Sequence, residues 1–288
     1  MTDAPHRQRP PSGPVLPARP ELSDGAFDGI RGLLRDKTGI AVSETKRHLV
    51  SRRLASRLRE LDCETYADYL ALLETGDAGE LQAFTNAMTT NQTSFFRERH
   101  HFEYLADSLL PQLDREKRQG RRRLRLWSAG CSTGEEAYSI AMTLREHLPA
   151  IDSWDARILC TDIDSSVIAH AREGRYSERQ VESVPDALRN RWLDRDGDTW
   201  VVREGLRALT VFKQLNLLQG WPMRGPFDAV FCRNVFIYFE RATQLRLVDR
   251  IAELLDDGGY LFLGHSESVI NASERFRLVG KTIYRKVR

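Results

Sequence analysis

The stretch GCSTGEEAYS, Gly130–Ser139, contains the residue types of two different chemical sites. It fits the G-x-S-x-G pattern of α/β-hydrolases, with Ser132 as nucleophile and with Asp228 and His265 following in the required chain order. It also fits a glycine turn that opens a helix and receives a cofactor. A hydrolase serine follows several strands, whereas the residues before Leu124 have helical or irregular patterns. The cofactor turn is therefore favoured, and Ser132 is interpreted as a small residue that lets the turn close.

Two carboxylates in this turn restrict the class of cofactor. Dinucleotides place an anionic pyrophosphate at a helix N-terminus, where the backbone amides and the helix dipole favour negative charge. Glu135 and Glu136 already occupy that position, and the lysine of a P-loop is missing. A cofactor with positive groups and no phosphates, such as S-adenosylmethionine, fits better. The alternative is that both glutamates only stabilise the helix dipole, by a few tenths to about 1 kcal/mol each.

The elements that would position the turn begin at Leu124. Short apolar runs alternate there with amphipathic helices, which is typical of a parallel sheet covered on both faces. The predicted strands are LRLWSAG, ARILCTDID, TVFKQLNLL, FDAVFCRN and GYLFLGHSES, with TIYRKV as an edge strand. Because ligands bind at the carboxyl ends of such strands, four polar positions should converge: Gly130, Asp162, Asn216 and Asn234. Asp162 is the candidate for the ribose hydroxyls, and Asp164 is the expected N-cap of the next helix.

Composition sets broader limits. The 288 residues carry 43 basic and 41 acidic side chains, so the charge balance indicates no nucleic-acid partner. No run approaches the roughly 18 apolar residues of a membrane span, and we expect a cytoplasmic protein without membrane insertion. Four cysteines without CxxC spacing predict free thiols and no metal site. The absence of coiled-coil heptads favours a monomer.

The patterning divides the chain into four parts. Residues 1–22 are rich in proline and are predicted to form a disordered tail, and residues 23–88 are predicted to form a helical domain. Residues 89–97 would form a linker that contributes to the cofactor site. Residues 98–288 would form the catalytic domain, with an inserted β-subdomain at 174–209.

Six segments together carry a family resemblance: NQTSFFRE, WSAGCSTGEEAYSIAM, CTDIDSSVIAHAREGRY, NLL, FDAVFCRNVFIYF and GGYLFLGHSES. In this order, over about Asp24 to Lys286, they closely resemble the CheR-type chemotaxis receptor methyltransferases. The resemblance implies a Rossmann-like α/β fold of class I, with a mainly parallel doubly wound sheet, a small antiparallel insertion and an N-terminal all-α domain. It also implies methylation of receptor glutamates by S-adenosylmethionine, which leaves S-adenosylhomocysteine.

The same resemblance implies roles for individual positions. Arg97 would pair with the methionine carboxylate, and Asn91 and Thr93 belong to the same segment. Gly130 and Glu136 would hold the methionine amino end, Asp162 the ribose, and Asn216 and Leu217 the adenine edge. The remaining cofactor positions follow the fourth strand: Arg233, Asn234 and Val235. Tyr238 would lie near the transferred methyl, and Tyr238 and Arg233 are predicted to orient the reacting groups without moving a proton.

Partner recognition is predicted on two elements. In the helix that contains Val50 and Leu54, a basic stripe of Lys46, Arg53 and Arg57 is expected to face the helical cytoplasmic region of a receptor, unless it is an ordinary solvated face. Some family members bind a receptor pentapeptide on the β-subdomain. The turn at Asp196 to Asp198 is shorter here, which favours an enzyme that needs no such tether.

Two other functions use the same cofactor site. A methyltransferase of nucleic acids or small molecules would need a base-stacking or small-molecule pocket, for which the sequence has no element. A noncatalytic cofactor sensor would keep Arg97 and Asp162 without requiring Tyr238.

Overall fold

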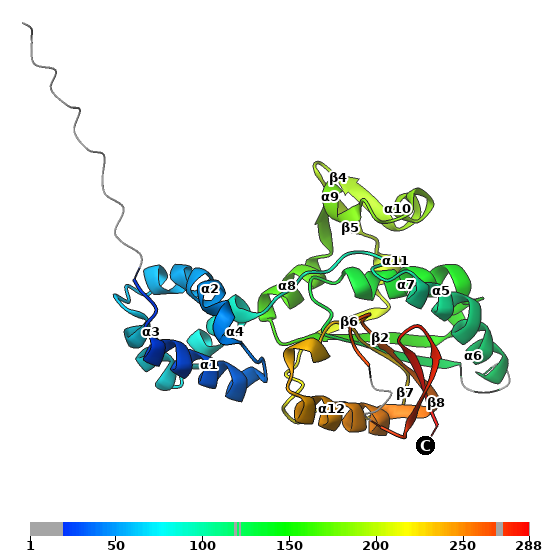
Figure 1. The fold of residues 1–288 in the computed structure, drawn as a ribbon. Helices are drawn as coiled ribbons and strands as arrows, with labels where there is room; N and C mark the ends of the chain where they lie inside the picture. Colours follow the sequence, from blue (N-terminus) through cyan, green and yellow to red (C-terminus); the bar gives the residue numbers. More distant parts are fainter. Residues whose placement is uncertain (1–19, 118–119, 121, 269–272, 288) are drawn as a thin grey trace, which may run out of the picture.

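The computed structural model describes residues 20–117, 120, 122–268 and 273–287. A helical domain and a larger α/β domain lie side by side and are joined by the linker (Figure 1). Residues 1–19 of the predicted tail lie outside the described residues. Leu22, which the sequence prediction also assigned to the tail, is only 6% exposed and packs in the core of the helical domain.

The helical domain contains α1 (Asp24–Thr38), α2 (Arg47–Glu60), α3 (Tyr66–Glu74) and α4 (Ala78–Met88), with a short 3-10 turn at Glu44–Lys46. Local sequence explains the ends of these helices. Ser23, Thr65 and Asp77 accept backbone N–H groups as N-caps, and α1 ends at Gly39, whose φ is +75°. Apolar faces of the four helices form one core.

The α/β domain is built on a seven-stranded sheet in the order β6-β2-β1-β7-β8-β10-β9. Its parallel strands are β6 (Thr210–Gln214), β2 (Asp155–Asp162), β1 (Arg123–Ala129), β7 (Phe227–Cys232) and β8 (Leu255–Leu263). β10 (Ile283–Lys286) and β9 (Phe276–Gly280) add antiparallel pairs. All five strands predicted ahead of TIYRKV are present.

The predicted edge strand is a correction. TIYRKV forms β10, which lies between β8 and β9 and therefore is not at the edge. The edge strand on this side of the sheet is β9, a segment that the sequence prediction did not assign, and β6 is the edge strand on the other side. The segment FRLVG has no regular alternation of apolar and polar residues, and three of its five residues are exposed.

Helices cover both faces of the sheet (Figure 1). α5 (His100–Tyr104), a π-helical turn (Leu105–Leu109), α6 (Leu110–Lys117), α7 (Glu135–His147) and α8 (Ser165–Glu173) precede or connect the first strands. α12 (Arg241–Leu254) packs on the opposite face with its own buried cluster. Within the described residues, no helix is both long and apolar enough to cross a membrane.

The insertion forms a second sheet in the order β3-β5-β4, which projects above α8 and α11 in Figure 1. Its elements are β3 (Arg175–Ser177), α9 (Glu178–Val181), α10 (Asp186–Trp192), β4 (Leu193–Asp196), β5 (Thr199–Val202) and α11 (Glu204–Arg207). Asp196 pairs with Thr199, so only Gly197 and Asp198 form the turn, and Gly197 has a φ of +61°.

Candidate cofactor and acceptor site

A cleft of about 280 Å³ lies where the carboxyl ends of the strands meet the linker and the helical domain. Every cofactor position predicted from the sequence lines it: Asn91, Thr93, Arg97, Gly130, Glu136, Asp162, Asn216, Leu217, Arg233, Asn234 and Val235. Tyr238, Lys46 and Arg53 line it as well, whereas Arg57 does not. The fold therefore brings together residues as far apart in the chain as Lys46 and Tyr238, and their contacts with a ligand stay predictions.

The glycine turn follows β1 and is held against the end of β2. The N–H groups of Gly130 and Cys131 both donate to the Thr161 carbonyl, at 2.7 and 2.9 Å. Gly130 has a φ of +83°, and a Cβ added there would lie 2.4 Å from Val235 Cγ2. Only glycine lets this turn approach the loop after β7 so closely.

Asp162 ends β2 inside the cleft. Its Oδ2 accepts the Ser132 N–H at 2.9 Å, and its Oδ1 accepts the Asp164 N–H at 3.0 Å. Burial raises the pKa of the Asp162 carboxyl, although these backbone hydrogen bonds oppose the rise. Carboxylate oxygens with lone pairs left over suit a ribose diol, as the sequence predicts.

The hydrolase alternative is wrong, because its three residues are kept apart. Ser132 Oγ donates to the Asn91 carbonyl at 2.9 Å. Asp228 pairs with Lys117 and accepts the Arg125 N–H at 2.8 Å, and the Nδ1 atom of His265 lies 3.0 Å from Glu98 Oε1. A nucleophile needs a base within hydrogen-bond reach, and Ser132 has none among its described contacts.

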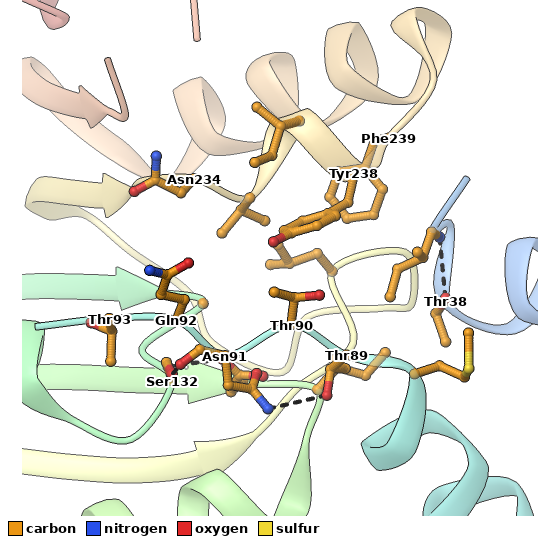
Figure 2. Close-up of a pocket in the computed structure, with 18 of the residues that line it drawn as sticks. Thr38, Thr89, Thr90, Asn91, Gln92, Thr93, Ser132, Asn234, Tyr238 and Phe239 are labelled. Atoms are coloured by element: carbon orange, nitrogen blue, oxygen red, sulfur yellow. Dashed lines mark hydrogen bonds between the residues drawn. The ribbon is translucent and has the colours of Figure 1, made fainter. Parts of the chain in front are cut away.

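Asp164, which follows β2, attaches the linker to the α/β domain, a role that was not predicted from the sequence. Asp164 caps α8 by accepting the Ser166 N–H at 2.9 Å, as predicted. Its other oxygen accepts the Thr89 hydroxyl and the Asn91 amide, each at 2.7 Å. Figure 2 shows the linker crossing the floor of the cleft below Tyr238. The Asn91 side chain therefore holds the linker in place.

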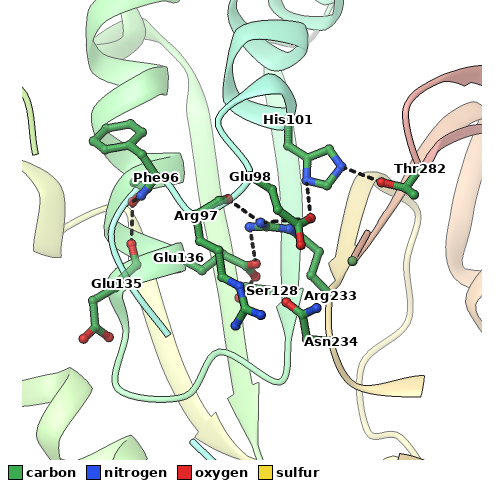
Figure 3. Close-up of polar contacts among 12 residues, drawn as sticks. Phe96, Arg97, Glu98, His101, Ser128, Glu135, Glu136, Arg233, Asn234 and Thr282 are labelled. Carbon is green, nitrogen blue, oxygen red and sulfur yellow. Dashed lines mark hydrogen bonds and ion pairs between the residues drawn. The ribbon is translucent and has the colours of Figure 1, made fainter. Parts of the chain in front are cut away.

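A buried charge network forms one end of the cleft (Figure 3). The Arg233 guanidinium lies 2.9 Å from Glu136 Oε2 and 3.3 Å from Glu98 Oε2, and it also donates to the Arg97 carbonyl. Ser128 Oγ donates to the second Glu136 oxygen at 2.6 Å. We call Arg233, Glu136 and Glu98 the charged triad. Glu98 was not among the predicted site residues, because it follows Arg97 directly and has no spacing that marks it.

The triad and its neighbours perturb two pKa values. Burial opposes ionisation of Glu98, but hydrogen bonds from His265 and the charge of Arg233 outweigh it and lower the Glu98 pKa to about 2. Burial, together with the charges of Arg233 and His100, lowers the pKa of His101 to about 3. His101 is therefore neutral at pH 7, with Nε2 3.0 Å from Thr282 Oγ1. Glu98 is an anion that offsets the charge of Arg233.

The two glutamates of the first turn of α7 differ in direction, which corrects the electrostatic argument from the sequence. Glu136 lines the cleft, whereas Glu135 is 2% exposed and bonds Thr133 and Gln180 away from it (Figure 3). The turn therefore offers one carboxylate, and Arg233 partly neutralises it. The case against phosphate is weaker than the sequence predicted, but the turn still presents an acid where a pyrophosphate would lie.

Arg97 has the freest guanidinium at this end of the cleft. Its described hydrogen bond is to the Gln92 carbonyl, at 2.9 Å. The remaining N–H donors form a planar fork, which is the geometry that binds one carboxylate through two parallel hydrogen bonds. Figure 3 shows the Arg97 side chain extending away from Arg233.

The opposite end of the cleft relies on backbone groups. Asn216 Nδ2 donates to the Lys37 carbonyl of the helical domain at 2.7 Å, and its Oδ1 accepts the Leu218 N–H at 2.9 Å. The Asn216 amide is therefore already engaged. Leu217 is 8% exposed and lines the cleft, and its N–H has no hydrogen-bond acceptor among the described residues. The Leu217 backbone N–H is therefore available to recognise a purine, and the Asn216 amide keeps one N–H without an acceptor among the described residues.

The loop after β7 is held by Glu267, another residue missed from the sequence. Its carboxylate accepts N–H groups from Gly264 at 2.7 Å, Asn234 at 2.8 Å and Ile237 at 3.3 Å. These bonds hold Asn234 at a φ of +59°. The loop continues into a 3-10 turn (Phe236–Tyr238), from which the Tyr238 hydroxyl points into the cleft (Figure 2). The Tyr238 carbonyl accepts the Ala41 N–H of the helical domain at 2.9 Å.

The three predicted receptor cations lie in different environments. Lys46 is exposed at the rim of the cleft. Arg53 donates to the Met88 carbonyl and to Thr90 Oγ1, so it holds the start of the linker. Arg57 pairs with Glu80, which is 8% exposed and also accepts the Tyr69 hydroxyl at 2.6 Å. A receptor role for all three stays a prediction: Arg57 is paired with carboxylates, the partners of Arg53 are neutral, and only Lys46 is exposed.

The charged and polar groups of the cleft match those of S-adenosylmethionine. Arg97 would hold the carboxylate, Glu136 the ammonium, Asp162 the ribose and the Leu217 N–H the adenine. The close approach of Gly130 and Val235 leaves no space there for a side chain at the turn. Among the described residues, no group of three or more His, Cys, Asp or Glu side chains could hold a metal ion.

Comparison with known proteins agrees with this geometry. Residues 25–89 match the family model described as "CheR methyltransferase, all-alpha domain", and residues 91–285 match "CheR methyltransferase, SAM binding domain". "Chemotaxis protein methyltransferase 2" of Pseudomonas aeruginosa is 46% identical over 264 residues, covering 90% of this chain and 91% of that protein. "Chemotaxis protein methyltransferase" of Escherichia coli is 42% identical over 270 residues, covering 91% of each.

Proposed function

Since this chain belongs to the CheR methyltransferase family and is an S-adenosylmethionine-dependent chemotaxis protein methyltransferase, we propose a class of substrate for it. The proposed substrates are glutamate side chains in the helical cytoplasmic region of chemoreceptors. The observation that carries the proposal is the cleft that joins the cofactor positions to Tyr238 and to the rim at Lys46. Methylation would adjust receptor signalling in adaptation. The enzyme would act in the cytoplasm as a monomer.

The proposed reaction asks little of acid and base groups. A glutamate with a pKa near 4.3 is already an ionised nucleophile at pH 7. When bound, S-adenosylmethionine supplies a methyl group on a good leaving group. The chain then has to align the acceptor and exclude water, which is where positioning lowers a barrier. Tyr238 would orient the acceptor carboxylate through its hydroxyl. Arg233 would act by holding Glu136 and the Arg97 backbone, since its guanidinium is engaged by them.

Receptor encounter would use the rim at Lys46. We expect Lys46→Glu to reduce receptor methylation by about threefold to tenfold at low salt, because a cation at the rim attracts an acidic partner, and to have less effect at high salt. Initial rates of receptor methylation at two salt concentrations would measure this. Arg115→Glu is the matched control, because Arg115 is an equally exposed cation on α6 outside the cleft lining. Equal losses in both variants would reject a specific rim.

We also propose that the enzyme needs no receptor pentapeptide. The two-residue turn at Gly197 and Asp198 supports this, because it leaves little loop beside β4 to cover a bound strand. Calorimetric titration with a receptor C-terminal pentapeptide should give no binding at micromolar concentrations. Receptors with and without that pentapeptide should be methylated at equal rates, and a rate that depends on the peptide would overturn the proposal.

Labelled cofactor tests the function as a whole. Incubation with methyl-labelled S-adenosylmethionine and receptor fragments should give a base-labile methyl ester on the receptor, and Tyr238→Phe should reduce its formation. Label that enters nucleic acid or a small molecule would support the alternative methyltransferases. Cofactor binding without any transfer would support the sensor.

A further inference from the structure

The adenine end of the cleft is held from outside by a residue on α12. We propose that Arg250 is a positioning residue for this end: it fixes the backbone of Leu217, whose N–H faces the cofactor, without touching the cofactor itself. This rests on the proposed function, since it assigns the cofactor's adenine to Leu217. Arg250 does not line the cleft.

Arg250 contacts the loop between β6 and β7 in three places. Its Nη1 donates to the Leu217 carbonyl at 2.7 Å, and its Nη2 donates to the Gln219 carbonyl at 2.6 Å. The guanidinium carbon also lies 3.8 Å from the centroid of the Trp221 ring. Burial lowers the pKa of Arg250, but a guanidinium stays charged at neutral pH. A planar fork that bonds two carbonyls and stacks on an indole is a geometry that lysine cannot reproduce.

Trp221 extends this grip to the centre of the sheet. Its Nε1 donates to the same Leu217 carbonyl at 3.2 Å, and its ring meets Trp127 edge-on at a centroid distance of 5.0 Å. Trp127 Nε1 in turn donates to Thr161 Oγ1 at 2.9 Å. Thr161 is the residue whose carbonyl holds the glycine turn. One continuous set of contacts therefore connects α12 to the glycine turn through the loop that contains Leu217 and Trp221.

The loop needs this external support because it has little of its own. Residues 215–226 connect β6 to β7 without a helix or strand. Inside the loop, the Leu218 and Gln219 N–H groups bond Asn216, at 2.9 and 3.1 Å. Those bonds shape the first turn but do not attach it to the rest of the α/β domain. The Leu215 N–H attaches the start of the loop to the Asp162 carbonyl at 2.9 Å. Arg250 attaches the following residues to α12, and the Asn216 amide attaches them to Lys37 of the helical domain.

The first test separates binding from transfer. We expect Arg250→Ala to raise the Kd of S-adenosylhomocysteine and the KM of S-adenosylmethionine about tenfold, as for the loss of one hydrogen bond between the Leu217 N–H and the adenine, while kcat changes less than twofold. Arg250→Lys should recover only part of the affinity. Arg246→Ala is the matched control, because Arg246 lies one turn earlier on α12 and bonds only Thr243 in its described contacts. It should bind both ligands like the wild type.

A double-mutant cycle identifies which end of the cofactor is affected. The losses of cofactor affinity in Arg250→Ala and Trp221→Leu should be less than additive, because both side chains hold the Leu217 carbonyl. Losses in Arg250→Ala and Arg97→Ala should add, because Arg97 lies at the other end of the cleft. Additivity with Trp221, or unchanged affinity in a folded Arg250→Ala, would overturn the proposal.

Failure of this inference differs from failure of the proposed function. If the chain bound no S-adenosylmethionine, the wild type itself would show no affinity in the titration. If only the inference failed, the wild type would bind and Arg250→Ala would bind equally well. Thermal unfolding of each variant shows whether an affinity loss reflects a damaged fold: a melting temperature lowered in Arg250→Ala together with a lower kcat would assign Arg250 to general stability and reject the positioning role.

Discussion

The two ends of the cleft achieve order by different means. At the charged end, Arg233 is buried between Glu136 and Glu98, and side-chain charges carry the structure. At the adenine end, the Asn216 side chain bonds backbone, and the loop carbonyls are held by Arg250 from outside. The first end is sensitive to the loss of a charge because its partners are buried. The second is sensitive to displacement of the backbone.

This difference predicts how each end fails. A buried charge left without its partner costs several kcal/mol. Removal of the cation from the charged triad should therefore lower the free energy of unfolding, and any loss of activity would come with that loss of stability. A displaced loop removes a few ligand contacts and leaves the core intact. Removal of the buried Arg233 cation should therefore lower stability, whereas displacement of the loop that contains Leu217 should lower cofactor affinity and leave the fold intact.

Arg233→Met should have the largest effect. It leaves Glu98 and Glu136, whose side chains are 11% and 10% exposed, buried without their cation. We expect the free energy of unfolding to fall by about 3–5 kcal/mol, measured by urea denaturation. The triple variant with Glu98→Gln and Glu136→Gln should recover most of that stability but not cofactor affinity. No recovery would mean that Arg233 contributes by packing.

Substitution of the two adjacent glutamates at the start of α7 should have the next largest effect, on cofactor affinity. Glu136→Gln should weaken S-adenosylhomocysteine binding about tenfold, because the amide no longer offers a charged acceptor to the cofactor's ammonium. Glu135→Gln removes a buried charge one residue earlier, where the carboxylate bonds Gln180. Calorimetric titration should show unchanged affinity for that variant. Similar losses in both would mean that the charge of the turn matters and its direction does not.

His101 provides the smallest effect. Its pKa is about 3 in the folded protein against 6.5 as the ordinary value, so between these values the unfolded chain binds more protons and stability falls as pH falls. The contribution is about 0.8 kcal/mol on going from about pH 7.5 to 6.0. His101→Asn should remove that part of the pH dependence in urea titrations. An unchanged slope would mean that His101 is charged in the folded state.

The sequence predicted those parts of the site that depend on element ends. Gly130, Asp162 and Asn234 follow apolar runs, and parallel strands bring such ends to one edge, so their convergence needed no coordinates. Glu98 and Glu267 could not be found this way, because each acts on a loop that is distant in the chain. Arg250 lies within an ordinary amphipathic helix pattern, and nothing in its spacing marks the carbonyls that it bonds.

Local sequence thus determined the strands, the helix after the glycine turn and the position of the cofactor edge, because periodicity and turn chemistry act over a few residues. Tertiary structure alone decided that Glu136 and not Glu135 faces the cleft, that Arg57 pairs with Glu80, and that β9 rather than β10 is the edge. These outcomes depend on which surfaces pack together. A side chain's direction within a buried turn follows from its distant neighbours, and those are set only when the sheet has formed.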